Sequence, residues 1–246
     1  MTRRRGRRGP VRSPSHRVWL LDLDNTLHDA TLHAFPRINA AMTGYVADLL
    51  GLPADEADAL RDHYWHRYGA TLLGLVRHHG VDPAHFLRET HRFDDMPRLV
   101  RRNDRLRAAL ARLPGRRIVL TNAPAAYAEA VLAALGIAPL IERVVSIESM
   151  RFAGRIQPKP SRAMLRRLVA TLRTDAARCV LLDDTPANLH SARAVGIRTV
   201  LVTGVGHRKA VRPVPRRAGR GRRIGLQVQS VTQLRREALR PVQETP

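Results

Sequence analysis

The sequence from Trp19 to Leu27 reads Trp-Leu-Leu-Asp-Leu-Asp-Asn-Thr-Leu. It begins as an apolar strand and ends in two carboxylates one residue apart, Asp22 and Asp24. Because alternate side chains of a strand point to the same side, both acids can face one site. Acids at the end of a buried strand are unfavourable without a compensating charge. A divalent cation is the simplest compensator, so the stretch predicts a metal-dependent site.

A calcium-binding loop would be another interpretation of this stretch. An EF-hand loop that began at Asp22 would need glycine at its sixth position and glutamate at its twelfth. Those positions hold Leu27 and His33. The sequence therefore excludes an EF-hand here.

Composition places the chain among globular proteins. Of its 246 residues, 44% are hydrophobic, which is enough for one large or two small cores. Charged residues interrupt every apolar run well before the roughly 20 residues of a membrane-spanning helix, so we expect no membrane span. The single cysteine, Cys179, precedes Val-Leu-Leu, which predicts a buried strand thiol. A lone cysteine also fits a reducing compartment, and we expect a cytoplasmic protein.

The net charge of +22 is concentrated near the ends of the chain. Residues 1–17 hold seven arginines, and residues 206–223 hold seven arginines and one lysine, with no acid in either segment. Both segments are poor in apolar residues, as disordered tails are. Such tails predict at most weak, nonspecific binding to polyanions. A nucleic-acid-binding protein with an inert core is the alternative from another functional class.

Apolar runs and helical periodicities alternate through the second half of the chain. The pattern predicts strands at 18–23, 117–121, 144–146, 179–182 and 199–202, with a possible last edge strand at 224–231. Helices are expected at 123–135, 161–172 and 186–195, and Ser161 is the expected N-cap of the second. This alternation is typical of a Rossmann-like α/β core, a mostly parallel sheet with helices on both faces.

Residues 28–114 show helical patterns and no strand. Helices are expected at 35–50, from Pro53 through Tyr68 towards Gly80, at 83–90 and at 104–113, with Gly69 and Gly74 as possible breaks in the second. The block follows the first strand, so it would form an all-helical cap over the carboxyl edge of the sheet. The predicted organisation is a basic disordered tail (1–16), a core (17–27 and 115–205), the cap (28–114), a basic linker or tail (206–223), and a possible final strand with a C-terminal tail (224–246).

Polar side chains follow several predicted strands. Asp22 and Asp24 end the first, Thr121 and Asn122 the second, and Asp183 and Asp184 the fourth, while Lys159 precedes the helix at 161–172. In open parallel sheets, ligands bind beyond the carboxyl ends of the strands. Several carboxylates suit Mg²⁺, and a lysine and a hydroxyl beside a metal suit a phosphoryl group. Taken singly, these residues could instead be helix caps or a solvated surface lysine.

The set Asp22-x-Asp24-x-Thr26, Thr121, Lys159 and Asp183-Asp184 resembles the four motifs of the haloacid dehalogenase (HAD) superfamily, over about residues 16–205. The cap is similar to that of the pyrimidine 5′-nucleotidases in the stretches 68–75 and 82–86, as are the runs 121–123 and 183–196. The resemblance implies a phosphomonoester hydrolase that acts on a pyrimidine nucleoside 5′-monophosphate, UMP or CMP. Another small phosphomonoester, such as phosphoglycolate or a sugar phosphate, is the alternative substrate.

The resemblance also implies a role for each motif residue. Asp22 would be the nucleophile that forms an aspartyl-phosphate, and Asp24 would protonate the leaving oxygen and then activate water. Thr121, Asn122 and Lys159 would bind the phosphate. Asp22, the backbone carbonyl of Asp24, and Asp184 would hold Mg²⁺. Asp183 stands where many relatives have glycine, and it would be a neighbour of the metal or an alternative ligand.

The chemistry of the residues agrees with an ester substrate. An alkoxide leaves more readily once it is protonated, whereas a halide needs no proton. A second acid two residues after the first therefore favours phosphate esters over haloacids.

The cap offers further candidates. Tyr64, Trp65 and Tyr68 could stack on a base or pack between helices. His63 and His66 lie three residues apart on one predicted helix, where a zinc site is conceivable without an evident third ligand. His28 could line the cap entrance. The sequence does not distinguish a monomer from a homodimer, and it contains no Walker loop, dinucleotide fingerprint or Cys-x-x-Cys motif.

Overall fold

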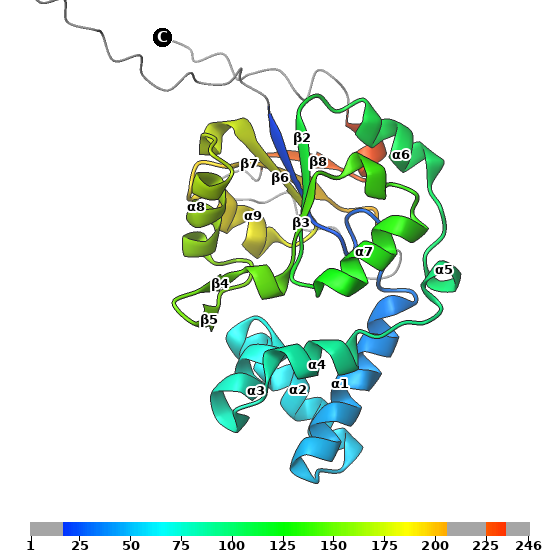
Figure 1. Ribbon diagram of the computed structural model, residues 1–246, viewed down its shortest axis with the longest axis vertical. Helices are drawn as coiled ribbons and strands as arrows, with labels where there is room; N and C mark the ends of the chain where they lie inside the picture. Colours follow the sequence, from blue (N-terminus) through cyan, green and yellow to red (C-terminus); the bar gives the residue numbers. More distant parts are fainter. Residues whose placement is uncertain (1–16, 206–224, 235–246) are drawn as a thin grey trace, which may run out of the picture.

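The computed structural model of the protein describes residues 17–205 and 225–234. The expected basic segments 1–16 and 206–223 and the tail after residue 234 lie outside the described residues. The core is a six-stranded parallel sheet of order β3-β2-β1-β6-β7-β8 (Figure 1). Its strands are β1 (Val18–Leu21), β2 (Arg116–Leu120), β3 (Arg143–Val145), β6 (Cys179–Asp183), β7 (Arg198–Val202) and β8 (Leu226–Val228). The expected α/β class is confirmed, and the last edge strand is β8.

Helices cover both faces of the sheet because the central strands are apolar on both sides. Trp19 and Leu21 of β1 pack on one face, whereas Val18 and Leu20 pack on the other. The first face is covered by α7 (Ala125–Ala134), α6 (Asp104–Ala111), α5 (Met96–Leu99) and part of α1 (Ala34–Leu50). The second face is covered by α8 (Arg162–Thr171) and α9 (Pro186–Arg193). Ser161 caps α8 as expected, since its side chain accepts a hydrogen bond from the Met164 amide.

The cap has its own apolar cluster. It is built from α1, α2 (Ala54–Tyr68), α3 (Thr71–His79) and α4 (Pro83–Thr90), which lie together below the sheet in Figure 1. Ile147, from the short helix after β3, joins this cluster and so ties the cap to the core. In contrast, Leu106 and Leu110 of α6 pack with the sheet. The helices that form the cap are therefore α1 to α4.

Glycines divide the long helical stretch after Pro53. Gly69 ends α2 with a left-handed φ of 82°, so the expected break at this position is confirmed. Gly74 lies inside α3, and the expectation of a possible break there is wrong. A Cβ at Gly74 would lie 2.2 Å from Cγ of Tyr64. Gly74 is thus required for the close packing of α3 on α2, not for a turn.

A short hairpin follows β3 and was not expected from the sequence. It pairs β4 (Arg151–Phe152) with β5 (Arg155–Ile156) in antiparallel fashion. Two residues per strand are too few to show an alternating pattern. The hairpin lies between β3 and α8, and the chain after it leads to Lys159.

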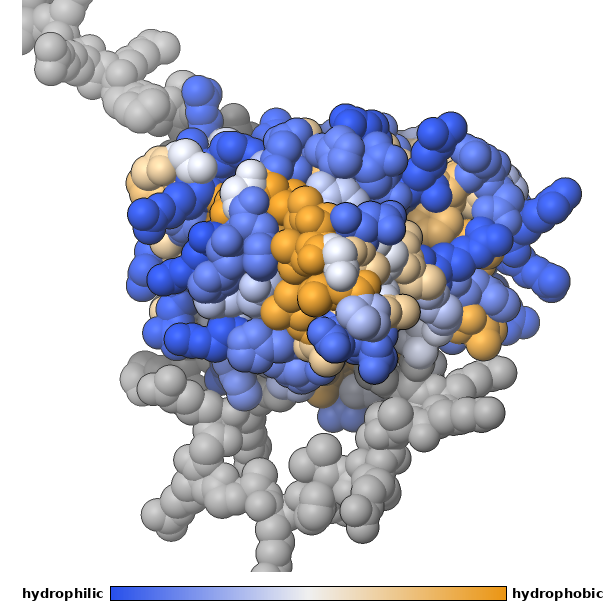
Figure 2. Space-filling view, turned by 90° about the horizontal axis from the view of Figure 1, so that it is seen from below, coloured by the Kyte–Doolittle hydropathy of each residue, from blue (hydrophilic) through white to orange (hydrophobic). Residues whose placement is uncertain are grey.

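Some hydrophobic side chains reach the surface. Seen from below, the molecule shows a continuous hydrophobic patch that hydrophilic residues surround (Figure 2). The large hydrophobic side chains exposed on α1 to α4 are Leu49, Trp65 and Val76. Among the described residues, no helix combines the length and the apolar character that crossing a membrane requires.

Candidate active site

The polar residues expected at the strand ends do come together. A cavity of about 530 Å³ lies between the carboxyl edge of the sheet and the cap. Its core wall includes Asp22, Asp24, Thr121, Asn122, Lys159 and Asp184. Backbone bonds set this arrangement, because the Asp22 amide continues the β1–β6 ladder to the Leu182 carbonyl (2.9 Å) and the Thr121 amide continues the β2–β3 ladder to the Val145 carbonyl (3.0 Å). The parallel register therefore brings residues about 100 positions apart to one edge.

Lys159 lies between two buried carboxylates. Its Nζ donates to Asp22 Oδ1 at 2.6 Å and to Asp183 Oδ2 at 2.8 Å. Burial alone would lower the pKa of Lys159, but the charges of Asp183 and Asp22 outweigh burial and raise it. Lys159 is therefore a permanent cation at the floor of the cavity. Burial also raises the pKa of Asp22, and the Lys159 charge opposes that rise.

Several neighbours hold Lys159 and its two carboxylate partners in place. The Asn122 side chain pairs with the backbone of Lys159, accepting from its amide at 2.9 Å and donating to its carbonyl at 3.0 Å. The Thr26 hydroxyl donates to Asp22 Oδ2 at 3.0 Å. Asp183, fully buried, accepts from the Thr185 amide and from Asn188 Nδ2 in addition to Lys159. Asp183 thus orients Lys159, a role that the sequence did not reveal.

Asp24 has partners of its own. The Tyr127 hydroxyl donates to Asp24 Oδ1 at 2.8 Å, and His28 Nε2 lies 2.9 Å from the same oxygen. Burial and the charge of Asp24 raise the pKa of Tyr127 well above its ordinary value, so Tyr127 stays a donor. Burial lowers the pKa of the neighbouring His91, whose ring packs edge-on against Tyr127, to about 4. Sequence reasoning missed Tyr127 and His91, whereas it placed His28 near the site.

The acidic residues form a group that fits a metal ion. One oxygen each from Asp22, Asp183 and Asp184 lies within 4.8 Å of the others. Three carboxylates face one ammonium, so this group carries two surplus negative charges when it is ionised. A hard divalent cation such as Mg²⁺ would neutralise that surplus and accept oxygen ligands of this kind. The residues therefore fit the expected metal.

The aromatic candidates of the cap separate into two groups. Tyr64 and Tyr68 pair through their hydroxyls with His79 (2.8 Å) and His78 (2.6 Å), and Tyr64 is buried in the cap cluster. Trp65 is 52% exposed and lines the cavity. Of the three, Trp65 is therefore the ring available to a ligand.

The remaining candidates do not belong to the site. In the described part of the chain, no group of three potential metal ligands includes His63 or His66, and His66 lies beside Asp62. Cys179 is buried in β6 as expected. Burial raises the pKa of its thiol to about 11, which makes a reactive thiolate unfavourable.

Comparisons with known proteins agree with this arrangement. The model of the haloacid dehalogenase-like hydrolase family matches residues 16–196. Phosphate metabolism protein 8 of Saccharomyces cerevisiae is 24% identical over 205 residues, which cover 78% of this chain and 63% of the yeast protein. A plasmid-encoded phosphoglycolate phosphatase of Cupriavidus necator is 37% identical over 95 residues, which cover 39% of each chain. The chain thus spans less than two thirds of the length of both curated relatives.

Solved structures share the fold at low sequence identity. A HAD phosphatase from Thermococcus onnurineus matches with a TM-score of 0.56 and 16% identity, covering 92% of this chain and 98% of the other. A 2-haloacid dehalogenase from Pseudomonas syringae pv. tomato matches with a TM-score of 0.54 and 20% identity, covering 91% of this chain and 97% of the other. A parallel α/β sheet with an acid cluster and a buried lysine at its carboxyl edge defines a hydrolase of this fold class. The chain belongs to the haloacid dehalogenase-like hydrolase family.

Proposed function

We propose that the chain is a Mg²⁺-dependent phosphomonoester hydrolase that acts through an aspartyl-phosphate on Asp22. The observation that carries the proposal is the presence of a second carboxyl, Asp24, in the same cavity as the pair of Asp22 and Lys159. An ester needs a proton on its leaving oxygen, and a halide does not. The similarity to the Cupriavidus necator phosphoglycolate phosphatase supports an ester substrate.

We propose a role for each of these side chains. Asp22 attacks phosphorus while Asp24 protonates the departing alcohol oxygen. Asp24 then takes a proton from the water that hydrolyses the aspartyl-phosphate, which regenerates the Asp22 carboxylate. Lys159 counters the negative charge of the phosphoryl oxygens. Thr121 accepts from the Ala123 amide at 3.0 Å, which leaves its own hydroxyl proton to donate to a phosphate oxygen beside the Asn122 backbone amide.

Asp22, the backbone carbonyl of Asp24, and Asp184 are the proposed ligands of Mg²⁺. Asp184 lines the cavity and is only half-buried. Both oxygens of Asp183 are already occupied by Lys159, Asn188 and the Thr185 amide. Asp184 lines the cavity and Asp183 does not, which supports Asp184 as the direct ligand and Asp183 as its neighbour. When bound, the ion supplies positive charge to the phosphate oxygens.

Removing divalent cations with EDTA is expected to lower phosphate release by at least about 100-fold, because the surplus negative charge of the aspartates would then repel the substrate. Release of inorganic phosphate from a small ester checks this, and excess Mg²⁺ should restore it. Circular dichroism in EDTA controls for unfolding. Unchanged turnover in EDTA would remove the metal from the proposal.

We further propose that the cap, helices α1 to α4, selects a pyrimidine nucleoside 5′-monophosphate such as UMP or CMP. The cavity volume of about 530 Å³ lies within the range of small-molecule sites. Trp65 presents an exposed ring on the cap side of the cavity, where a base could stack. The alternative substrate is phosphoglycolate, because the Cupriavidus necator relative is a phosphoglycolate phosphatase.

A substrate panel with variants of Trp65 distinguishes these substrates. Trp65→Ala is expected to lower kcat/KM for UMP and CMP about 10-fold, since a stacked base is worth about 1–3 kcal/mol. The same change should leave kcat/KM for phosphoglycolate within about twofold, because that substrate has no base to stack. Trp65→Phe is the matched control that retains a ring. A wild-type preference for phosphoglycolate or for a sugar phosphate would contradict the pyrimidine assignment and leave the esterase activity standing.

A further inference from the structure

The two oxygens of the Asp24 carboxyl have different surroundings. Oδ1 faces both the Tyr127 hydroxyl at 2.8 Å and His28 Nε2 at 2.9 Å. An ionised carboxylate only accepts hydrogen bonds, so both neighbours donate to it. Oδ1 can accept both hydrogen bonds whether or not the carboxyl is protonated, so Oδ2 is the oxygen left to carry a proton in the protonated form.

Tyr127 is well fixed for this purpose. Its side chain is 1% exposed in α7, and its ring packs against those of His91 (6.0 Å between centroids) and Phe93 (5.7 Å). His28 is also buried, four residues after Asp24 on the same loop. The donors thus come from two segments that are 103 residues and four residues away from Asp24 in the chain. A carboxyl held from two directions cannot rotate freely about χ2.

We propose that Tyr127 and His28 are positioning residues that fix the Asp24 carboxyl, so that Oδ2 delivers its proton to the leaving oxygen. This inference rests on the proposed ester hydrolysis. Neither residue contacts the substrate in this scheme. Their effect is to reduce the number of orientations that Asp24 adopts before proton transfer, which is an entropic contribution to the barrier.

Leaving-group dependence tests the role. A good leaving group such as 2,4-dinitrophenolate needs little protonation, whereas an alkoxide needs a full proton. We expect Tyr127→Phe to lower kcat/KM for an alkyl phosphate by about 10-fold or more, and for 2,4-dinitrophenyl phosphate by less than about twofold. The ratio kcat/KM reports on steps up to formation of the aspartyl-phosphate, so the later use of Asp24 as a base does not interfere.

Matched variants separate positioning from general damage. Tyr45→Phe removes another tyrosine hydroxyl, which pairs with His85 on the cap at 2.9 Å. This control should leave kcat/KM unchanged for both esters. His28→Gln keeps an N–H donor and should retain more activity on the alkyl phosphate than His28→Phe. Equal losses on both esters, or no loss on the alkyl ester, would overturn the proposal. A wild-type protein that hydrolyses neither ester would instead overturn the proposed function.

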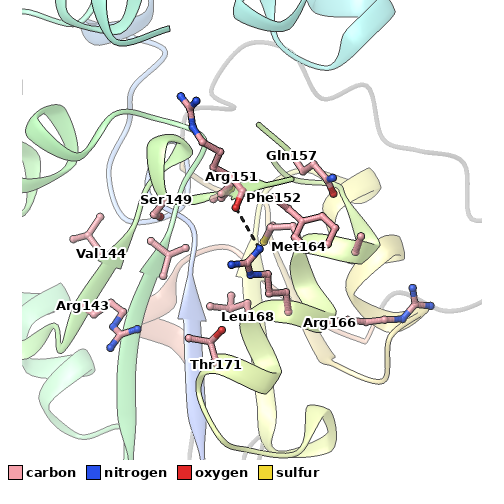
Figure 3. Close-up of a pocket in the computed structure, with 14 residues that line it drawn as sticks. Arg143, Val144, Ser149, Arg151, Phe152, Gln157, Met164, Arg166, Leu168 and Thr171 are labelled. Atoms are coloured by element: carbon pink, nitrogen blue, oxygen red, sulfur yellow. Dashed lines mark hydrogen bonds between the residues drawn. The ribbon is translucent and has the colours of Figure 1, made fainter. Parts of the chain in front are cut away.

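A second cavity, next to the β4–β5 hairpin, supports an independent inference. It measures about 550 Å³ and lies between β3, the β4–β5 hairpin and α8. Figure 3 shows Phe152, Met164 and Leu168 towards its middle and Arg143 at one edge, while the side chains of Arg151 and Arg166 extend away from the apolar residues. Arg167 also lines it, with its guanidinium 5.1 Å from the Phe152 ring centre. Among the lining residues of the described chain, none is acidic.

The four arginines of this cavity form no ion pair with the acids of the described chain. The hydrogen bond from Arg116 and, less strongly, the charge of Arg143 nevertheless lower the pKa of the adjacent Glu142. Glu142, next to Arg143 in the chain, is already paired with Arg116 at 2.7 Å. A largely apolar hollow whose charged lining residues are all arginines complements a ligand with an apolar body and a negative group. We propose that this cavity binds a small organic anion with an apolar body.

Fluorescence titration with 8-anilinonaphthalene-1-sulfonate tests this site, with inorganic phosphate present to occupy the active site. We expect Arg143→Gln/Arg167→Gln to raise the Kd of the sulfonate at least about 10-fold, as loss of a charged hydrogen bond does. The Kd of the neutral analogue N-phenyl-1-naphthylamine should change less than about twofold in the same double variant. Arg101→Gln/Arg105→Gln removes the same charge at exposed positions outside the cavity and should have little effect. Equal shifts in the two double variants, or an unchanged Kd in the first, would refute the proposal.

Discussion

Replacing Asp22 with asparagine is expected to lower phosphate release by on the order of 10⁴-fold or more, as loss of a catalytic nucleophile does. An amide is a poor nucleophile towards phosphorus, and it cannot form the acyl-phosphate that a carboxylate forms. The change is nearly isosteric. The amide oxygen can still accept from Lys159 or from Thr26, which contact Asp22 at 2.6 and 3.0 Å. We therefore expect a folded but inactive protein.

The assay is release of inorganic phosphate from UMP and from an alkyl ester, with circular dichroism and thermal unfolding as checks of the fold. Asp48→Asn, an exposed change on α1 outside the cavity, is the matched control and should keep wild-type activity. A wild-type rate in Asp22→Asn would mean that another group attacks phosphorus. Trapping of labelled phosphate on the wild-type protein and not on the variant would support the aspartyl-phosphate directly.

Much of the fold could be predicted because its signals are local. The apolar runs of β1, β2 and β6 and the helices between them show in the sequence, and parallel pairing then brings their carboxyl ends together. This rule places Asp22, Thr121 and Asp183 at one edge from the sequence alone. The short hairpin of β4 and β5 has no such local signal.

The partners of the acids could not be predicted, because they depend on how helices pack over the sheet. Tyr127 is the third residue of α7, in an alanine-rich helix whose apolar face gives no sign that one hydroxyl reaches Asp24. The pairing of the Asn122 side chain with the Lys159 backbone, 37 residues away, also leaves no trace in the sequence pattern. Gly74 resembles a helix breaker until the contact with Tyr64 is seen. In each case the deciding contact joins segments whose spacing is set by tertiary packing.

Replacing Lys159 with methionine is expected to lower the free energy of unfolding by about 3–5 kcal/mol at neutral pH, as loss of one partner of a buried ion pair does. Lys159 is 3% exposed and contacts two carboxylates that are themselves buried. Methionine fills a similar volume without the charge, so the repulsion between Asp22 and Asp183 is left uncompensated. Turnover should fall at least about 100-fold, since the phosphoryl oxygens lose a cation.

The pH dependence of unfolding gives this prediction its sharpest test. Burial and the charge of Asp183 raise the pKa of Asp22, and Lys159 opposes that rise, so without Lys159 the folded state holds a proton on Asp22 more tightly than the unfolded state does. Its stability then rises as pH falls, and the loss caused by Lys159→Met should be smaller at pH 5 than at pH 8. Urea unfolding in EDTA at both pH values measures this. The double variant Lys159→Met/Asp183→Asn should recover part of the loss, because one buried charge is removed. An equal loss at both pH values would show that the cost comes from packing, and not from the charges that Lys159 holds together.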